Sequence, residues 1–297
     1  MNALEDLYRE LRPYAFAIAY RMLGTVSEAE DVVQDAFVRL SQVPPAEIES
    51  PKSYLATVTT RLAIDSLRSA RAQRETYFGP WLPEPLVTDA GPGPDSAAET
   101  ADSLAVAFLV VLETLTPVER AVFLLHDVFD FDYAEIARIV GKSEANCRQL
   151  ASRARRHVED GKPRFEASRE RSIRLAEQFF AACQGIDMNG LVELLAGDVA
   201  FYGDGGAHGE GLKVPMFGRD QVARFLLGLF RRARILNAQM VPVEVNGQPG
   251  AKFLDQDGAL INVMSVDIAD GVVQTVRSFV NPDKIAHVGK LSPIGRR

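Results

Sequence analysis

The segment between Glu144 and Val158 carries the side-chain types that proteins use to read DNA bases. Arginine can pair bidentately with guanine, asparagine or glutamine can pair with adenine, and further arginines bind phosphates. The candidates are Asn146, Arg148, Gln149, Arg153 and Arg156. On a helical wheel the apolar residues share a separate arc: Cys147, Leu150, Ala151, Ala154 and Val158. We therefore predict a helix with one packed and one DNA-contacting face, and a solvated basic face is the alternative.

A second basic segment, Lys52 to Arg74, mixes aromatic, hydroxyl and guanidinium groups. Such groups suit contacts with phosphates and with unstacked bases, where stacking contributes about 1–3 kcal/mol per base. The residues that carry the pattern are Tyr54, Thr57, Thr59, Thr60, Arg61, Arg68 and Arg71. Asp65 lies four residues after Arg61 and three before Arg68, so we expect it to form an ion pair within the helix.

Helices must position both segments. A break at Gly141-Lys142-Ser143 separates two predicted helices, 132–140 and 144–158, and this pattern is typical of a helix-turn-helix. Before it, helices are predicted at 103–115 and 117–128, and the second basic segment forms a helix over 52–74 after Pro51. That helix is expected to bury one side formed by Leu55, Val58, Leu62 and Ser66.

An earlier amphipathic helix is predicted near the N-terminus. Ser27 and Glu30 have the spacing of a capping box. The apolar residues that follow recur at helical period: Val32, Val33, Ala36, Phe37 and Leu40. Charged residues occupy the opposite face: Glu28, Asp31, Asp35 and Arg39.

The segment 78–94 contains five prolines and three glycines and is predicted to be a linker. Its apolar residues are ones that a solvated spacer does not need: Trp81, Leu82, Leu86 and Val87. We expect them to pack against a neighbouring domain.

The region after residue 165 changes character. Helices predicted at 169–184, 187–195 and 219–234 are followed by strands at 259–268 and 272–280, with the turn signal Asp270-Gly271 between them. This order predicts an α+β domain.

Composition excludes several classes. The chain has 297 residues, 47% hydrophobic and 25% charged, with two cysteines and a net charge of −7. The cysteines form no zinc or disulfide pattern, and the longest apolar run, Leu104 to Leu112, is too short to span a bilayer. We predict a cytoplasmic protein with no metal, cofactor or membrane contact. Its acidic surfaces suit a basic protein partner and limit non-specific DNA binding.

Residues 1–162 resemble a bacterial RNA polymerase sigma factor of the extracytoplasmic-function type. The motifs are SEAEDVVQDAFVRL, SPKSYLATVTTRLAIDSLRSAR and DYAEIARIVGKSEANCRQLASRARRHV. The resemblance implies that the first motif binds core polymerase through Glu28, Asp31, Asp35 and Arg39. It also implies that the second motif contacts the promoter −10 element and the third reads the −35 element. The family commonly has asparagine where Arg61 stands.

The linker and the C-terminal region resemble the subgroup fused to a SnoaL-like domain of the NTF2-like fold. The matching residues are Trp81, Leu82, Pro83, Glu84, Pro85, Asp204, Gly205, Gly206, Asn281, Pro282, Asp283 and Lys284. The implied organisation is a helical domain at 1–76, a linker at 77–102, a helix-turn-helix domain at 103–162 and an α+β domain at 166–297. The resemblance also implies that the last domain contacts the linker and modulates the front half in cis.

Two functional hypotheses follow. The first is a sigma factor that directs promoter-specific initiation and catalyses no reaction. The second is a helix-turn-helix regulator whose SnoaL-like domain binds a small molecule or is an enzyme. Its candidate acid/base residues are Asp204, His208, Asp255 and Asp257, in glycine-rich or turn segments without a catalytic set. We favour the first, with core RNA polymerase and promoter DNA as partners, and leave an unidentified small-molecule ligand open.

Overall fold

The computed structural model describes residues 3–75, 77, 79–89, 103–161, 168–208 and 211–293. The chain divides into two compact units, and its path alternates between them. The first unit combines Met1–Thr76 with Phe108–Lys162, and the second combines Tyr77–Ala107 with Pro163–Arg297. The segment predicted to be a linker therefore belongs, where it is described, to the second unit.

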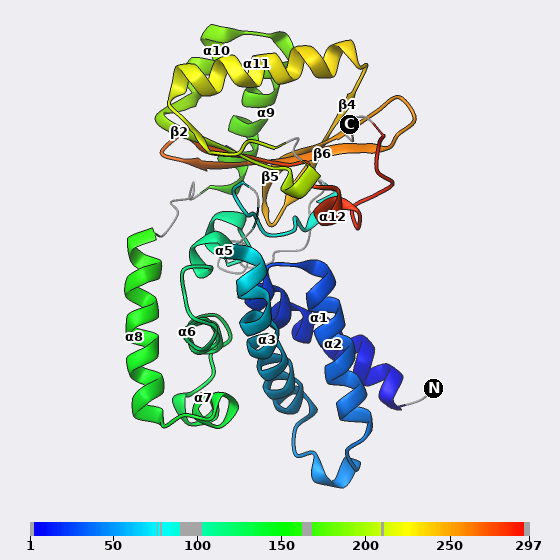
Figure 1. Cartoon of the computed structure of the whole chain (residues 1–297), viewed down its shortest axis with the longest axis vertical. Helices are drawn as coiled ribbons and strands as arrows, with labels where there is room; N and C mark the ends of the chain where they lie inside the picture. The colour runs from blue at the N-terminus through cyan, green and yellow to red at the C-terminus, as the bar shows by residue number, and fades with distance from the viewer. Residues whose placement is uncertain are drawn as a thin grey trace. The chain divides into compact units, whose positions relative to one another are not determined.

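The front of the first unit is a three-helix packing of α1 (Ala3–Leu23), α2 (Val26–Ser41) and α3 (Pro51–Glu75), with a short 3-10 turn at Pro45–Glu47 (Figure 1). The apolar face predicted for α2 is buried, together with Ala29. The capping box predicted at Ser27 and Glu30 is wrong. Thr25 is the N-cap residue, and its hydroxyl donates a 2.6 Å hydrogen bond to the Glu28 carboxylate.

Helix α3 buries a wider face than its sequence predicts. Leu55 is buried as expected, whereas Val58, Leu62 and Ser66 are only half-buried. The remaining buried residues of α3 are Ala56, Thr59, Thr60, Ala63, Ile64 and Leu67. The reason is that α3 packs against α1 and α2 and also against α6 and α7 of the same unit.

The helix-turn-helix pattern is confirmed in α7 (Tyr133–Val140) and α8 (Glu144–Gly161). Asp132 caps α7 in a capping box with Glu135, and Gly141 ends it in the left-handed conformation with φ 65°. The preceding α6 (Pro117–Phe123) continues as a π-helical turn over Leu124–Val128, and α5 (Val106–Leu112) is shorter than predicted. A shared core joins α6, α7 and α8, with these buried members: Val122, Leu125, Ile136, Ile139, Cys147, Leu150 and Ala151.

The second unit is a seven-stranded sheet in the order β1-β4-β5-β6-β7-β2-β3. The strands are β1 (Val87–Asp89), β2 (Leu195–Asp204), β3 (Met216–Phe217), β4 (Gln239–Val245), β5 (Gln248–Leu254), β6 (Leu260–Ala269) and β7 (Val272–Phe279). Only β2 and β7 pair in parallel among these described strands. The hairpin predicted around Asp270-Gly271 is confirmed as β6 and β7.

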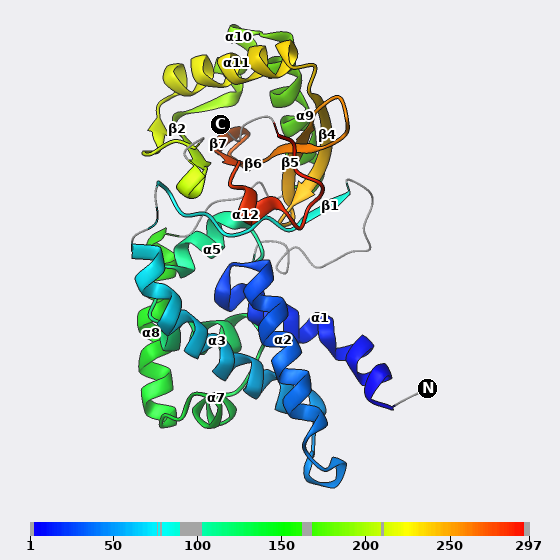
Figure 2. The same ribbon diagram turned by 45° about the vertical axis from the view of Figure 1, so that its right-hand side comes forward.

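Helices α9 (Arg169–Gly185), α10 (Met188–Leu194) and α11 (Arg219–Ile235) lie on one face of this sheet (Figures 1 and 2). They enclose a core that includes Phe179, Phe201, Leu226, Val266 and Val276. A short α12 (Pro282–Ile285) follows β7. The α+β prediction for this region is confirmed. None of the helices that the structure describes is long and apolar enough to cross a membrane.

Candidate functional site

Helix α8 presents the predicted division into two faces. Its buried side is the predicted set Cys147, Leu150, Ala151, Ala154 and Val158. The side chains predicted to contact DNA are all exposed: Asn146, Arg148, Gln149, Arg153 and Arg156. Because the apolar face anchors α8 on α6 and α7, the basic face is held outward on a rigid element.

Local contacts orient two of these arginines. The Arg148 guanidinium lies 2.9 Å from the Glu144 carboxylate and 5.2 Å from the centre of the Tyr133 ring. Arg153 lies 3.5 Å from Glu119. The Arg148–Glu144 pair is exposed on both sides, and such pairs contribute only about 0–1 kcal/mol, so exchanging it for a base or a phosphate costs little.

The second basic helix, α3, places its candidates less uniformly. Tyr54 and Thr57 are half-buried, and Arg68 is exposed and pairs with Asp65 at 3.2 Å, as predicted. The side chain of Arg71 lies outside the described residues. Thr59 and Thr60 are fully buried, so the expectation that they contact nucleic acid is wrong.

Arg61 makes a contact that the sequence did not indicate. Its Nε donates to the carbonyl of Ile139 at 2.9 Å, and its Nη2 donates to the carbonyl of Arg138 at 2.8 Å. Both carbonyls belong to the last turn of α7, where helix carbonyls lack partners within the helix and attract cations. The guanidinium therefore ties α3 to the helix-turn-helix inside the first unit.

The charged face of α2 is available for a partner. Asp31, Asp35 and Arg39 are exposed, and Glu28 is half-buried beside Thr25. Val38 lies on the same helix with 49% of its surface exposed.

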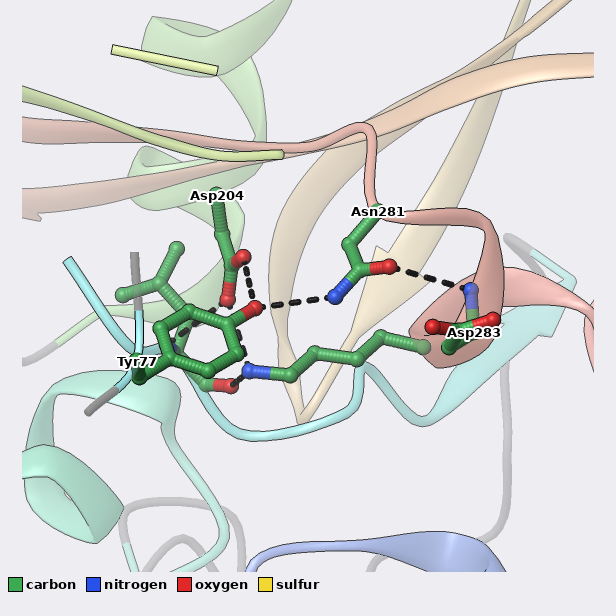
Figure 3. A network of polar contacts seen from close by, with 6 residues as sticks. Tyr77, Asp204, Asn281 and Asp283 are labelled. Carbon is green, nitrogen blue, oxygen red and sulfur yellow. Dashed lines mark hydrogen bonds and ion pairs between the residues drawn. The ribbon is translucent and has the colours of Figure 1, made fainter. Parts of the chain in front are cut away.

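In the second unit, Asp204 joins the predicted linker to the end of the sheet (Figure 3). One carboxylate oxygen accepts hydrogen bonds from the backbone N–H of Leu82 at 2.9 Å and from Nζ of Lys284 at 2.7 Å. The other accepts a short hydrogen bond from the hydroxyl of Tyr77. Asn281 donates to the same hydroxyl at 2.8 Å. We call residues 77 and 79–89 the strap, because this network fastens them to the domain.

Lys284 is the centre of the network. Its ammonium also donates to the carbonyl of Leu82 at 2.6 Å, and it lies 4.4 Å and 4.5 Å from the ring centres of Tyr77 and Trp81. Asp204 is 1% exposed and Lys284 is 6% exposed. Burial, followed by the negative charge of Asp204, raises the pKa of Tyr77. The expected contact of Trp81 with the C-terminal domain is therefore present.

The remaining motif residues support the same attachment. Pro83, Glu84 and Pro85 are buried. Gly206 has φ 57°, and a side-chain carbon there would lie 2.4 Å from the Asn281 amide nitrogen. The absence of a side chain at Gly206 thus leaves room for Asn281. The Asn281 side chain in turn caps α12, because it accepts a 3.1 Å hydrogen bond from the N–H of Asp283. The backbone of Gly205 lies against Gly211, where a side-chain carbon would lie 2.2 Å from the Gly205 nitrogen.

Other attachments of the predicted linker were missed from the sequence. Asn246 and Leu86 exchange two hydrogen bonds of 2.8 Å and 2.9 Å, and the Asn246 amide also donates to the carbonyl of Leu104. A ring nitrogen of His287 lies 2.9 Å from the carbonyl of Pro85. Strand β1, inside the strap, pairs with β4. Only the apolar character of Leu86 and Val87 pointed to this docking.

Two of the acid/base candidates, Asp204 and Asp255, serve local structure. Asp204 is committed to the strap, and Asp255 accepts from the N–H groups of Asp257 and Ala259 and from the Ser292 hydroxyl. These hydrogen bonds, that of Ser292 first, lower the pKa of Asp255. The side chain of His208 lies outside the described part. Within the ranges that the structure describes, no three histidine, cysteine, aspartate or glutamate side chains could hold a metal ion together.

Known proteins resemble this chain in both sequence and structure. Residues 7–73 match Sigma-70 region 2, and residues 105–158 match Sigma-70, region 4. The chain is 37% identical to the ECF RNA polymerase sigma factor SigJ of Mycobacterium tuberculosis, over 93% of this chain and 91% of that protein. It is 31% identical to the probable ECF RNA polymerase sigma factor SigI of the same species, over 94% of this chain and 93% of that protein.

The crystal structure of M. tuberculosis SigJ aligns with a TM-score of 0.75 and 35% sequence identity, covering 94% of this chain and 97% of that chain. The chain belongs to the extracytoplasmic-function RNA polymerase sigma factors.

Proposed function

We propose that this sigma factor binds core RNA polymerase through α2, contacts the −10 element through α3 and reads the −35 element through α8. The observation that carries the proposal is the exposure of five base- and phosphate-binding side chains on α8 opposite a fully packed face. A complex with the cytoplasmic polymerase is the first test. The chain should copurify with core enzyme at one copy per polymerase, whereas a conventional regulator would bind duplex DNA unaided.

The α2 surface supports a protein partner. It combines exposed charges of both signs with the exposed apolar Val38, and an apolar centre with a polar rim is typical of protein interfaces. Asp31, Asp35 and Arg39 are the side chains that we assign to polymerase binding, with Glu28 beside them.

The compact first unit supports a change of shape on promoter binding. The −10 and −35 elements are about 25 base pairs apart, which is roughly 85 Å at 3.4 Å per base pair. A helix the length of α3 spans only about 38 Å. With α3 packed on α7 and Arg61 bound to the α7 carbonyls, the two basic surfaces do not reach elements that far apart. Arg61 must leave α7 before it contacts DNA.

Replacing Arg61 and Arg68 together by alanine is expected to impair opening of the −10 region more than −35 binding. The reason is that α3, not α8, carries the groups suited to unstacked bases. Permanganate footprinting measures the reactivity of the −10 thymines. Arg9→Ala, at an exposed position of α1, is the matched control. Thymine reactivity equal to that of the wild type would remove the −10 assignment.

The second unit is proposed to modulate the first in cis, without an enzymatic step. The two parts of the first unit are connected through residues 77–107, and the strap fastens much of this connection to the second unit. Fully extended, a free connection of this length spans roughly 100 Å. A connection that is partly held against the second unit spans a shorter distance. The strap therefore limits how far the two DNA-binding regions can separate.

Trp81→Ala is expected to raise promoter-dependent transcription several-fold, because it weakens the strap and shifts the population toward separated DNA-binding regions. The measurement is runoff transcript yield with saturating core polymerase. Ile235→Ala, at an exposed position at the end of α11, is the control and should transcribe like the wild type. A Trp81→Ala yield at or below the wild-type level would contradict restraint by the strap.

A further inference from the structure

The second unit contains a cavity of about 160 Å³ between α11 and the sheet. Its lining is dominated by aromatic and aliphatic side chains, which include Phe201, Phe225, Leu229, Phe230, Phe253 and Met264. An apolar cavity of about 150 Å³ can hold one benzene molecule. The space therefore fits a single small ring.

One polar pair interrupts this lining. The amide nitrogen of Asn262 on β6 donates to the hydroxyl of Ser278 on β7 at 3.0 Å, and both residues line the cavity. The amide oxygen of Asn262 and the hydroxyl proton of Ser278 have capacity for one polar atom of a ligand. Among the residues that the structure describes, the lining includes no aspartate, glutamate or histidine, and Arg232 is its one charged member. The cavity is thus suited to binding rather than to acid/base chemistry.

The cavity and the strap share a wall. Gly203, Gly211 and Leu212 line the cavity, and the N–H of Leu212 donates to the carbonyl of Gly203 at 3.1 Å. Gly203 directly precedes Asp204, which holds the strap. On the other side of this wall, a side-chain carbon at Gly79 of the strap would lie 3.1 Å from the Leu212 carbonyl oxygen. A ligand that displaces this wall displaces strap contacts as well.

We propose that this cavity binds an uncharged, mainly apolar ring compound with one hydrogen-bonding oxygen, and that its binding changes the packing of the strap around Trp81. The ring would occupy the aromatic part, and the oxygen would meet Asn262 and Ser278. The consequence for transcription rests on the proposed restraint by the strap. The binding itself does not.

Benzyl alcohol is a suitable probe, and toluene is the matched probe that lacks the oxygen. Titration calorimetry on the full chain measures binding, and Trp81, the single tryptophan, reports on the strap by its fluorescence.

Ala233→Phe fills the cavity from α11, and Leu229→Phe does so from a second position. Ile235→Phe adds the same ring at an exposed position of α11 as the control. Circular dichroism selects the variants that fold.

The wild type and Ile235→Phe are expected to bind benzyl alcohol saturably, with a parallel change in Trp81 emission. Folded cavity-filling variants should lose both signals. Asn262→Leu should keep toluene binding and reduce the preference for benzyl alcohol by about 2- to 10-fold, the loss of one hydrogen bond.

The proposed site would be overturned if the wild type showed no saturable binding of benzyl alcohol, or if a folded cavity-filling variant bound it as well as the wild type. Binding that leaves Trp81 emission unchanged would overturn its connection to the strap. No arm contains polymerase or DNA, so these results are separate from a failure of the sigma-factor assignments.

Discussion

Lys284→Met is expected to lower the free energy of unfolding of the second unit by about 3–5 kcal/mol. The substitution leaves Asp204 as a buried carboxylate without its cation, and breaking a buried pair from one side has a cost of this size. It also removes the donor to the Leu82 carbonyl. Urea unfolding followed by circular dichroism measures the loss.

Two variants make this result specific to the buried pair. Lys290→Met, at an exposed lysine of the same unit, should change stability by less than about 0.5 kcal/mol. Adding Asp204→Asn to Lys284→Met removes the stranded charge and keeps an acceptor for Leu82, so it should recover part of the loss. If Lys284→Met and Lys290→Met unfold at the same urea concentration, the pair does not hold the strap.

Arg148→Ala and Arg153→Ala are each expected to weaken −35 recognition by about 1–3 kcal/mol, with core polymerase binding unchanged. Both side chains are exposed on α8, and the exposed ion pair of Arg148 with Glu144 is weak enough to be exchanged for a base. Holoenzyme affinity for promoters with intact and altered −35 elements measures the effect. Arg155→Ala is the control, because this half-buried arginine pairs with Asp127 at 2.7 Å.

The pattern across promoters separates two roles for these arginines. Replacing a base-reading residue lowers holoenzyme affinity for the intact −35 sequence and changes its affinity for altered sequences little. An equal loss on every −35 sequence would make Arg148 and Arg153 phosphate contacts only.

The boundary of α7 with α8, and the buried face of α8, follow from local sequence. Asp132 with Glu135 starts α7, Gly141 ends it, and the apolar arc of α8 is buried as predicted. Each depends on residues within one or two turns, so periodicity and capping suffice to predict them. Thr25 shows the limit even there, because it and Ser27 are both suitable caps and the helix begins after the first of them.

The strap could be predicted only in part. Apolar side chains between prolines indicated that Trp81 docks on a neighbour, and the motif resemblance indicated Asp204 and Lys284. The docking of β1 on β4 and the hydrogen bonds from Asn246 join residues more than a hundred positions apart. No local pattern encodes such pairings.

Arg61 illustrates the same limit in the first unit. Its charge and place on α3 predicted a nucleic-acid contact, whereas its guanidinium binds carbonyls at the end of α7. Thr59 and Thr60 are polar yet buried, since α3 packs on two sides. Tertiary neighbours, rather than residue type, decided these positions.

Runoff transcription with purified core polymerase tests the central assignment most directly. We expect promoter-specific transcripts that require this chain. We also expect these transcripts to be lost when Arg148 and Arg153 are both replaced by alanine, while the polymerase complex persists. A chain that binds duplex promoter DNA unaided and yields no promoter-specific transcript with core polymerase would contradict it.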